Sequence, residues 1–230
     1  MQHGKKYLAV ASKIEAKKAY SLGEASALAV ETSPAKFDAS VEIHINLNVN
    51  VKHADQIVRG TVIPPHGTGK VQRIAAFVEA DQVRTAKDAG ADLAGLEDLI
   101  DEISKGNINF DIAIAHPNVM KGLGKIAKTL GQKGLMPNPK SGTVTMDIAS
   151  TISEIKRGKV EYRTDKTGII HCIVGKVSFG ADKIKENAKV ILEAVLADKP
   201  VAVKGNYVNS VFMTTTMGPS VKIDFNRLAE

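Results

Sequence analysis

A regular alternation of apolar and polar residues marks one segment in the first quarter of the chain. The apolar positions are Val41, Ile43, Ile45, Leu47 and Val49, and polar residues, His44 among them, separate each pair. Because successive side chains of a strand point to opposite faces, this period of two predicts a strand with one buried and one polar face. His44 falls on the polar face, where an ordinary surface histidine is favoured over a metal ligand.

Signals on either side of this strand predict further helices and strands. Ser21 and Glu24 have the spacing of a capping box, so a helix is expected from there to Val30, after a first helix over 5–19. Strands are predicted at 59–63, 160–163, 169–174, 206–216 and 220–225, and an amphipathic helix at 181–197. The strands at 160–163 and 169–174 have the pattern of a hairpin around 164–168.

The middle of the chain has a different pattern. Strands expected at 71–78, 91–94 and 110–115 alternate with helices expected at 81–89 (capped by Asp81), around 99–103, at 117–130 and at 147–157 (capped by Asp147). Such alternation is typical of a parallel sheet with helices on its faces. The fold is therefore predicted to be α/β with two domains. An α+β two-layer outer domain is formed by both termini, residues 1–67 plus 159–230, and residues 68–158 form an inserted three-layer α/β (Rossmann-like) domain.

An inserted domain requires two linkers that run side by side. Both predicted linkers contain glycine, which permits sharp changes of chain direction: Gly67 and Gly69 in the first, and Gly158 in the second. We expect these glycines to act as a double hinge.

Charge and composition narrow the class of partner. The 230 residues include 31 Lys and Arg against 25 Asp and Glu, a net charge of +6. The outer segments hold 19 basic and 14 acidic residues, which is +5, so the outer domain is favoured to bind a polyanion such as nucleic acid. Six Phe, four Tyr and no Trp argue against extensive base stacking. A single cysteine and the lack of a run of about 18 apolar residues predict a cytoplasmic protein without a membrane partner.

The sequence predicts no catalytic residue, metal site or cofactor. Gly67-Thr68-Gly69-Lys70 lacks the outer glycine and the final hydroxyl of a phosphate-binding loop, and it precedes a strand instead of a helix. Gly122 and Gly124 fall inside a predicted helix, whereas a dinucleotide-binding loop precedes one. The chain is therefore expected not to be an enzyme. A nucleotide-binding enzyme that uses the α/β insert, and a protein-interaction module without an RNA role, remain as alternatives.

Three stretches have the composition of contact surfaces. The first is the glycine- and proline-rich loop 131–143, where Lys133, Met136, Asn138 and Lys140 are candidates for a second contact site. The second is the hydroxyl-rich run 214–219, and the third is the segment 35–38 before the alternating strand. A flexible connection, a turn between strands and a phenylalanine that seals the core are the respective alternative interpretations.

Four short motifs carry a resemblance to a known family. They are DQIVRGT at 55–61, PHGTGK at 65–70, GLMPNPK at 134–140 and TTMG at 215–218. Together, and in this order, they resemble the bacterial large-subunit ribosomal protein L-one family over essentially the whole chain.

The resemblance implies a structural component of the large ribosomal subunit that forms the mobile stalk next to the tRNA exit site. Its implied partners are large-subunit (23S) rRNA, exit-site tRNA, the mRNA of its own operon, whose translation it would repress, and the rest of the large subunit. It would be ribosome-bound in the cytoplasm and a monomer off the ribosome. The family's rRNA-binding patch maps onto Lys36, Phe37, Asp38, Arg163, Asp165, Lys166, Thr167, Thr215, Thr216, Met217 and Gly218.

Overall fold

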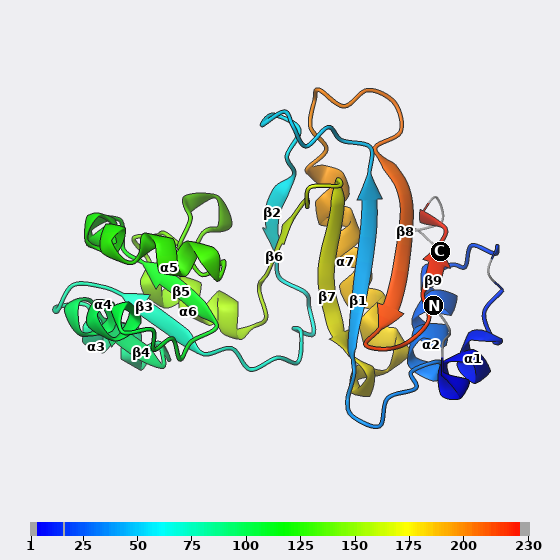
Figure 1. The fold of residues 1–230 in the computed structure, drawn as a ribbon, viewed down its shortest axis with the longest axis horizontal. Coiled ribbons are helices and arrows are strands. Elements are labelled where there is room, and N and C mark those ends of the chain that lie inside the picture. Colours follow the sequence, from blue (N-terminus) through cyan, green and yellow to red (C-terminus); the bar gives the residue numbers. More distant parts are fainter. Residues whose placement is uncertain (1–3, 16, 226–230) are drawn as a thin grey trace. The chain divides into compact units, whose positions relative to one another are not determined.

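The computed structural model describes residues 4–15 and 17–225, and the chain divides into two compact units. The outer unit contains residues 1–69 and 160–230, and the inserted unit contains residues 70–159 (Figure 1). The first helix of the outer unit, α1 (Lys5–Ala11), is shorter than the predicted helix over 5–19.

A four-stranded antiparallel sheet forms the centre of the outer unit. Its strands are β1 (Ser40–Leu47), β7 (Ile169–Lys176), β8 (Val208–Thr215) and β9 (Val221–Ile223), in the order β7-β1-β8-β9. The predicted alternation in β1 is confirmed, because Val41, Ile43 and Ile45 are all fully buried while His44 is partly exposed. One face of β1 therefore belongs to the core and the other is polar.

Two helices, α2 (Leu22–Glu31) and α7 (Gly180–Ala197), cover the buried face. The predicted capping box is confirmed at the start of α2: the Ser21 hydroxyl accepts from the Glu24 amide, and the Glu24 carboxylate accepts from the Ser21 amide at 3.0 Å. In α7, Ile184, Ala188 and Ile191 point into the same core. Figure 1 shows α7 behind β7, β1 and β8, with the near face of these strands bearing no helix. The outer unit thus has two layers.

The predicted hairpin between 160–163 and 169–174 is wrong. Strand β6 (Val160–Arg163) pairs with β2 (Arg59–Val62) in a separate two-stranded antiparallel sheet, whereas β7 pairs with β1. The Thr164 amide donates to the Val58 carbonyl and so continues the pairing with the β2 segment. A tight turn does follow at 165–168, but only one isolated bridge, Thr164 to Ile170, joins the two predicted hairpin arms. Both arms bury apolar residues, and the alternation alone does not identify their partners.

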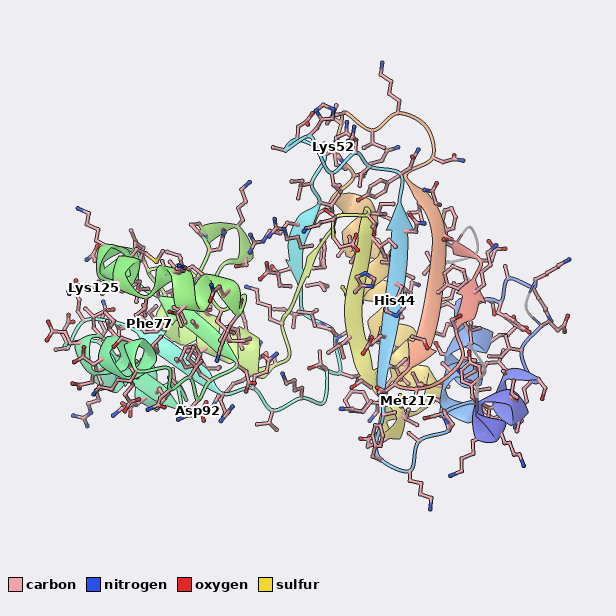
Figure 2. All side chains as sticks on the ribbon, in the orientation of Figure 1. His44, Lys52, Phe77, Asp92, Lys125 and Met217 are labelled. Atoms are coloured by element: carbon pink, nitrogen blue, oxygen red, sulfur yellow. The ribbon has the colours of Figure 1, made fainter. Side chains whose placement is uncertain are left out.

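The inserted unit confirms the predicted three-layer α/β architecture. Its parallel strands β3 (Ile74–Phe77), β4 (Leu93–Gly95) and β5 (Ile112–Ala115) have the order β4-β3-β5. One core contains side chains of α3 (Val83–Asp88) and α6 (Ile148–Lys156), and a second contains those of α4 (Glu97–Ser104), the 3-10 helix η1 (Pro117–Lys125) and α5 (Ala127–Gln132). Phe77 is fully buried in the second core, edge-to-face against Phe110 (Figure 2).

Two helix predictions in this unit need correction. Helix α3 begins after Gln82 without a side-chain cap, so Asp81 does not cap it. The single helix predicted over 117–130 is divided into η1 and α5, with Gly122 and Gly124 inside the 3-10 segment, because glycine is a poor α-helix former. By contrast, Asp147 caps α6 as expected, since its carboxylate accepts from the Ser150 amide at 3.0 Å. Short 3-10 turns, η2 (Pro139–Ser141) and η3 (Val177–Phe179), complete the fold.

The first linker is anchored to the outer unit by a buried amide on α7. Asn187 is fully buried; its side chain donates to the carbonyls of Gly67 and Val174 at 2.8 Å each and accepts from the His66 amide at 3.1 Å. Gly67 and Gly69 have φ values of 65° and 70° and Gly158 has a φ of 95°, a region that favours glycine. The backbone at the point where the chain leaves the outer unit is therefore fixed to α7 by these hydrogen bonds.

We expect Asn187→Leu to lower the free energy of unfolding of the outer unit by about 2–4 kcal/mol, because it leaves buried backbone groups without partners. All four tyrosines, Tyr7, Tyr20, Tyr162 and Tyr207, lie in the outer unit, so tyrosine near-UV circular dichroism during urea unfolding follows this unit alone. The exposed Lys189→Ala on the same helix is the control and should stay within about 0.5 kcal/mol of wild type. An unchanged unfolding midpoint for Asn187→Leu would contradict the anchoring role.

Candidate nucleic-acid interface

The residues predicted to bind RNA gather at the two ends of strand β1. Residues 36–38 and 215–218 lie at its beginning, where the Thr216 amide donates to the Ser40 carbonyl at 3.0 Å. The turn 165–168 lies at its other end, where the Leu47 amide donates to the Gly168 carbonyl at 3.0 Å. At about 3.3 Å per residue, the two groups are roughly 20 Å apart along the strand. We call them the Thr216 cluster and the Asp165 cluster.

Hydrogen bonds hold the Thr216 cluster rigidly in place. The Thr216 hydroxyl accepts from the Ser40 amide at 3.2 Å, across 176 residues of sequence. Asp38 accepts from both the amide and the hydroxyl of Ser178, at 3.0 and 2.8 Å, and these bonds lower the pKa of its carboxyl. Lys36 and Phe37 are exposed beside this anchor. Asp38 thus orders the segment that presents its two neighbours to solvent.

The TTMG turn presents one apolar side chain. Met217 is 74% exposed and has a φ of 68°, which non-glycine residues adopt only rarely (Figure 2). Thr215 is only 2% exposed, and its hydroxyl has no partner among the described residues. The Gly218 amide donates to the Thr215 carbonyl at 2.8 Å, which closes the turn. Thr215 and Gly218 therefore shape the turn, whereas Met217 is accessible to a partner.

The Asp165 cluster is ordered by one carboxylate. Asp165 accepts from the amides of Ile169 and Thr167 at 2.8 Å each, and also from the Thr167 hydroxyl. Chiefly the bond from Ile169, followed by those from Thr167, lowers the pKa of Asp165 to about 2. Arg163 and Lys166 are exposed on either side of it. Asp165 thus shapes a turn whose neighbouring side chains are basic.

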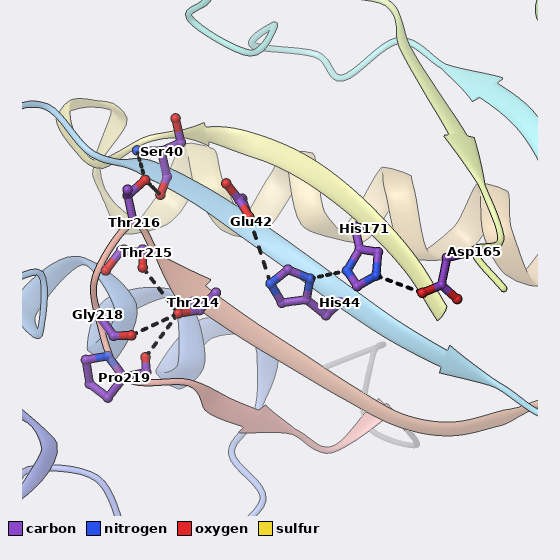
Figure 3. Close-up of polar contacts among 10 residues, drawn as sticks. All are labelled: Ser40, Glu42, His44, Asp165, His171, Thr214, Thr215, Thr216, Gly218 and Pro219. Atoms are coloured by element: carbon purple, nitrogen blue, oxygen red, sulfur yellow. Dashed lines mark hydrogen bonds and ion pairs between the residues drawn. The ribbon is translucent and has the colours of Figure 1, made fainter. Parts of the chain in front are cut away.

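A row of titratable side chains connects the two clusters across the uncovered face of the sheet. It runs from Glu42 and His44 on β1 to His171 on β7 and then to Asp165 (Figure 3). His44 and His171 are directly opposite each other in the β1–β7 register. The sequence places each histidine on the polar side of its strand, but only the register of two strands 127 residues apart brings them together. Sequence reasoning missed this pair for that reason.

The second predicted contact site lies in the inserted unit and has a defined structure. Lys133 and Lys140 are exposed, while Met136 is partly buried against the core of that unit. The Asn138 side chain accepts from the Lys140 amide at 2.8 Å, and its backbone is bonded to Thr143. The loop is therefore ordered by its own hydrogen bonds, and its two lysines are the groups that it offers to a partner.

Neither glycine pair considered as a nucleotide-binding loop lies between a strand and the N-terminus of a helix. The segment after Gly69 continues into β3, and Gly122 and Gly124 lie within η1. Among residues 4–15 and 17–225, no three His, Cys, Asp or Glu side chains are placed to hold a metal ion. Burial raises the pKa of the Cys172 thiol to about 12. In the described part of the chain, no helix is long and apolar enough to cross a lipid bilayer.

These features define a two-unit α/β protein with a polar, hydroxyl-rich surface on the uncovered face of its outer sheet. The model of the ribosomal protein L1p/L10e family matches residues 29–219. A large ribosomal subunit protein uL1 from Fervidobacterium nodosum is 49% identical over 230 residues, which are 100% of this chain and 98% of the relative. Another from Chloroflexus aggregans is 51% identical over 226 residues, with 97% and 95% covered. The chain belongs to the ribosomal protein L1p/L10e family.

We expect Gly218→Ala to destabilise the outer unit by about 1–3 kcal/mol, because the added Cβ would collide with the buried Thr215 hydroxyl. Gly23→Ala is the matched control: its Cβ would lie 3.5 Å from Lys185 Nζ, an ordinary contact, and alanine favours the helix. Urea unfolding followed by tyrosine circular dichroism measures both. Equal stability of Gly218→Ala and wild type would show that the turn does not need glycine.

Proposed function

We propose that this chain is a non-enzymatic component of the large ribosomal subunit that binds large-subunit rRNA through its outer unit. In this proposal it forms the mobile stalk next to the tRNA exit site, ribosome-bound in the cytoplasm. The observation that carries the proposal is the full-length similarity to two relatives that are named as large ribosomal subunit proteins. The motifs of the Thr216 cluster lie within that similarity.

The chemistry of the outer unit supports RNA as the ligand. The unit holds 18 basic and 14 acidic residues, and this net charge of +4 attracts phosphates without regard to sequence. The exposed groups of the two clusters are lysines, an arginine, a hydroxyl, the Asp38 carboxylate, which Ser178 already holds by two hydrogen bonds, and two apolar side chains, Phe37 and Met217. Such groups suit recognition of a folded RNA by its backbone, its 2′-OH groups and a few unstacked bases. Because strands and hydrogen-bonded turns carry these groups, binding costs little ordering entropy.

The inserted unit is proposed to contact exit-site tRNA and to assist the release of deacylated tRNA. Its segment 112–158 has seven basic and two acidic residues, a net charge of +5, and contains Lys133 and Lys140 of the second contact loop. Gly67, Gly69 and Gly158 are proposed as the hinge that allows this unit to follow the tRNA. Off the ribosome, the chain is proposed to be a monomer that represses its own operon mRNA through the surface that binds rRNA.

Binding to an rRNA fragment from the base of the stalk, compared with an unrelated hairpin of equal length, tests the proposal. We expect tight and selective binding whose log affinity falls with log salt, by about 0.7–0.9 for each phosphate neutralised. Equal and weak binding to both RNAs would contradict the proposed function. Binding that does not respond to salt would instead favour a protein-interaction module.

Met217→Asp tests the assignment of the Thr216 cluster. We expect it to weaken rRNA binding by about 1–3 kcal/mol, or roughly 5- to 150-fold, because it replaces an exposed apolar contact with a charge that repels phosphate. Val201→Asp is the matched control, since Val201 is a fully exposed apolar residue of the same unit outside both clusters. Met217→Asn separates loss of the side chain from added charge, because asparagine tolerates the positive φ. Wild-type affinity for Met217→Asp at matched salt would remove this turn from the interface.

A further inference from the structure

The two histidines on the uncovered face of the outer sheet share a hydrogen bond. His44 Nδ1 and His171 Nδ1 are 2.7 Å apart, so one of these atoms carries a proton and the other accepts it (Figure 3). The outer nitrogen of each ring faces a carboxylate: His44 Nε2 is 4.0 Å from Glu42 Oε2, and His171 Nε2 is 3.6 Å from Asp165 Oδ2. The pair therefore lies between two negative charges.

The contact between the two rings favours one protonation state of the pair over the others. With three protons, one lies between the two Nδ1 atoms, and one on each Nε2 faces a carboxylate at ion-pair distance. With two protons, one Nε2 faces a carboxylate as a lone pair, which is unfavourable. A fourth proton would point two N–H donors at each other and would open the 2.7 Å contact. The two rings therefore share one proton across the 2.7 Å contact.

The position of the pair makes its charge relevant to an RNA ligand. The pair lies between the Thr216 and Asp165 clusters along β1, so an RNA that follows this strand from one cluster to the other passes over it. The side chains of His44 and His171 are 28% and 52% exposed, which leaves both accessible. With neutral histidines, the row carries two carboxylates and repels phosphate. Each proton that the pair takes up cancels one of these charges.

The surroundings of the pair contribute few other charges. On β8, the residues opposite β1 are neutral: Phe212 pairs with His44, Ser210 with Asn46, and Thr214 with Glu42. On β7, Ile173 is opposite Glu42. On β9, Lys222 pairs with Phe212, one strand further from His44. Glu42, Asp165, the two histidines and Lys222 are therefore the charged and titratable groups of this part of the face.

We propose that His44 and His171 are a further contact of the RNA interface, and that RNA binding is coupled to proton uptake by this pair. The inference rests on the proposed function, because it requires an RNA bound across the outer sheet. It adds a regulation of that site: affinity that depends on pH near neutrality.

The electrostatics of the free protein agree with such coupling. Burial, and next the neighbouring His171, lower the pKa of His44, while Glu42 opposes this shift. Burial thus favours the neutral form of His44 in the free protein. A nearby phosphate favours the protonated form and raises the pKa of His44 in the complex. When binding raises a pKa, the protonated histidine adds to the affinity for RNA at low pH. This added affinity is lost as the pH rises through the pKa that the histidine has in the RNA complex.

The test measures affinity for the stalk rRNA fragment from pH 6 to pH 8 at constant salt. We expect the wild-type protein to bind about three- to tenfold more tightly at pH 6 than at pH 8, with a slope of at most one log unit per pH unit for one proton. His44→Gln/His171→Gln should still bind the RNA but with little dependence on pH. His66→Gln is the matched control: it removes another histidine–carboxylate pair, with Glu186 on α7, and should retain the wild-type pH profile.

Calorimetric titration of the wild-type protein in buffers of different ionisation enthalpy counts the protons directly and needs no variant. Tight wild-type binding without proton uptake would overturn the coupling and leave the proposed function intact. A pH dependence that persists in the double variant would assign it to other groups and would also overturn the coupling. Absence of selective RNA binding at every pH would instead contradict the proposed function itself.

Discussion

The outer unit depends on strand β1, which pairs along both edges with strands from distant parts of the chain. Residues joined across these edges are separated by 127 residues for His44 and His171, and by 176 for Ser40 and Thr216. Closing such long loops has an entropic cost. Burial of Val41, Ile43 and Ile45 against α2 and α7 offsets it, at about 25 cal/mol for each Å² of apolar surface removed from water. A separate pairing explains how the chain accommodates an inserted unit: Val62 and Val160 are neighbours in the β2–β6 ladder, so the chain leaves the outer unit and returns to it at adjacent positions.

The polar face of the outer sheet results from the same alternation that builds the core. When every second side chain of β1 is buried, the others lie together on the uncovered side, and the register decides which of them meet. Within the clusters at the two ends, the residues have separate tasks. Asp38, Asp165 and Thr216 hold the backbone by hydrogen bonds, whereas Lys36, Lys166 and Met217 extend into solvent. A surface made in this way is ordered before any partner binds.

Elements that depend on short stretches of sequence were predicted well. The capping box at Ser21, the cap at Asp147, the alternation of β1 and the three-layer insert all agree with the structure, whereas the predicted cap at Asp81 does not. The errors have a common cause. Each concerned a choice between two strand partners, or two backbone conformations, that the local sequence favours about equally. Strand β6 pairs with β2 instead of β7, and the segment after Pro117 forms a 3-10 helix before α5. Local signals do not rank such alternatives, because tertiary packing supplies the difference in free energy.

The sequence by itself determined the α/β class and the different patterns of secondary structure in the outer and middle segments. It also determined the excess of basic residues and the motifs of a ribosomal protein family. Periodicity, capping and composition are properties of residues close together along the chain, and they act before the chain is compact. Only the tertiary structure decided that the predicted RNA-binding segments occupy two ends of one strand, that Thr215 is buried while Met217 is exposed, and that His44 lies against His171. These facts depend on strand register across more than a hundred residues, and register is set by how the whole core packs.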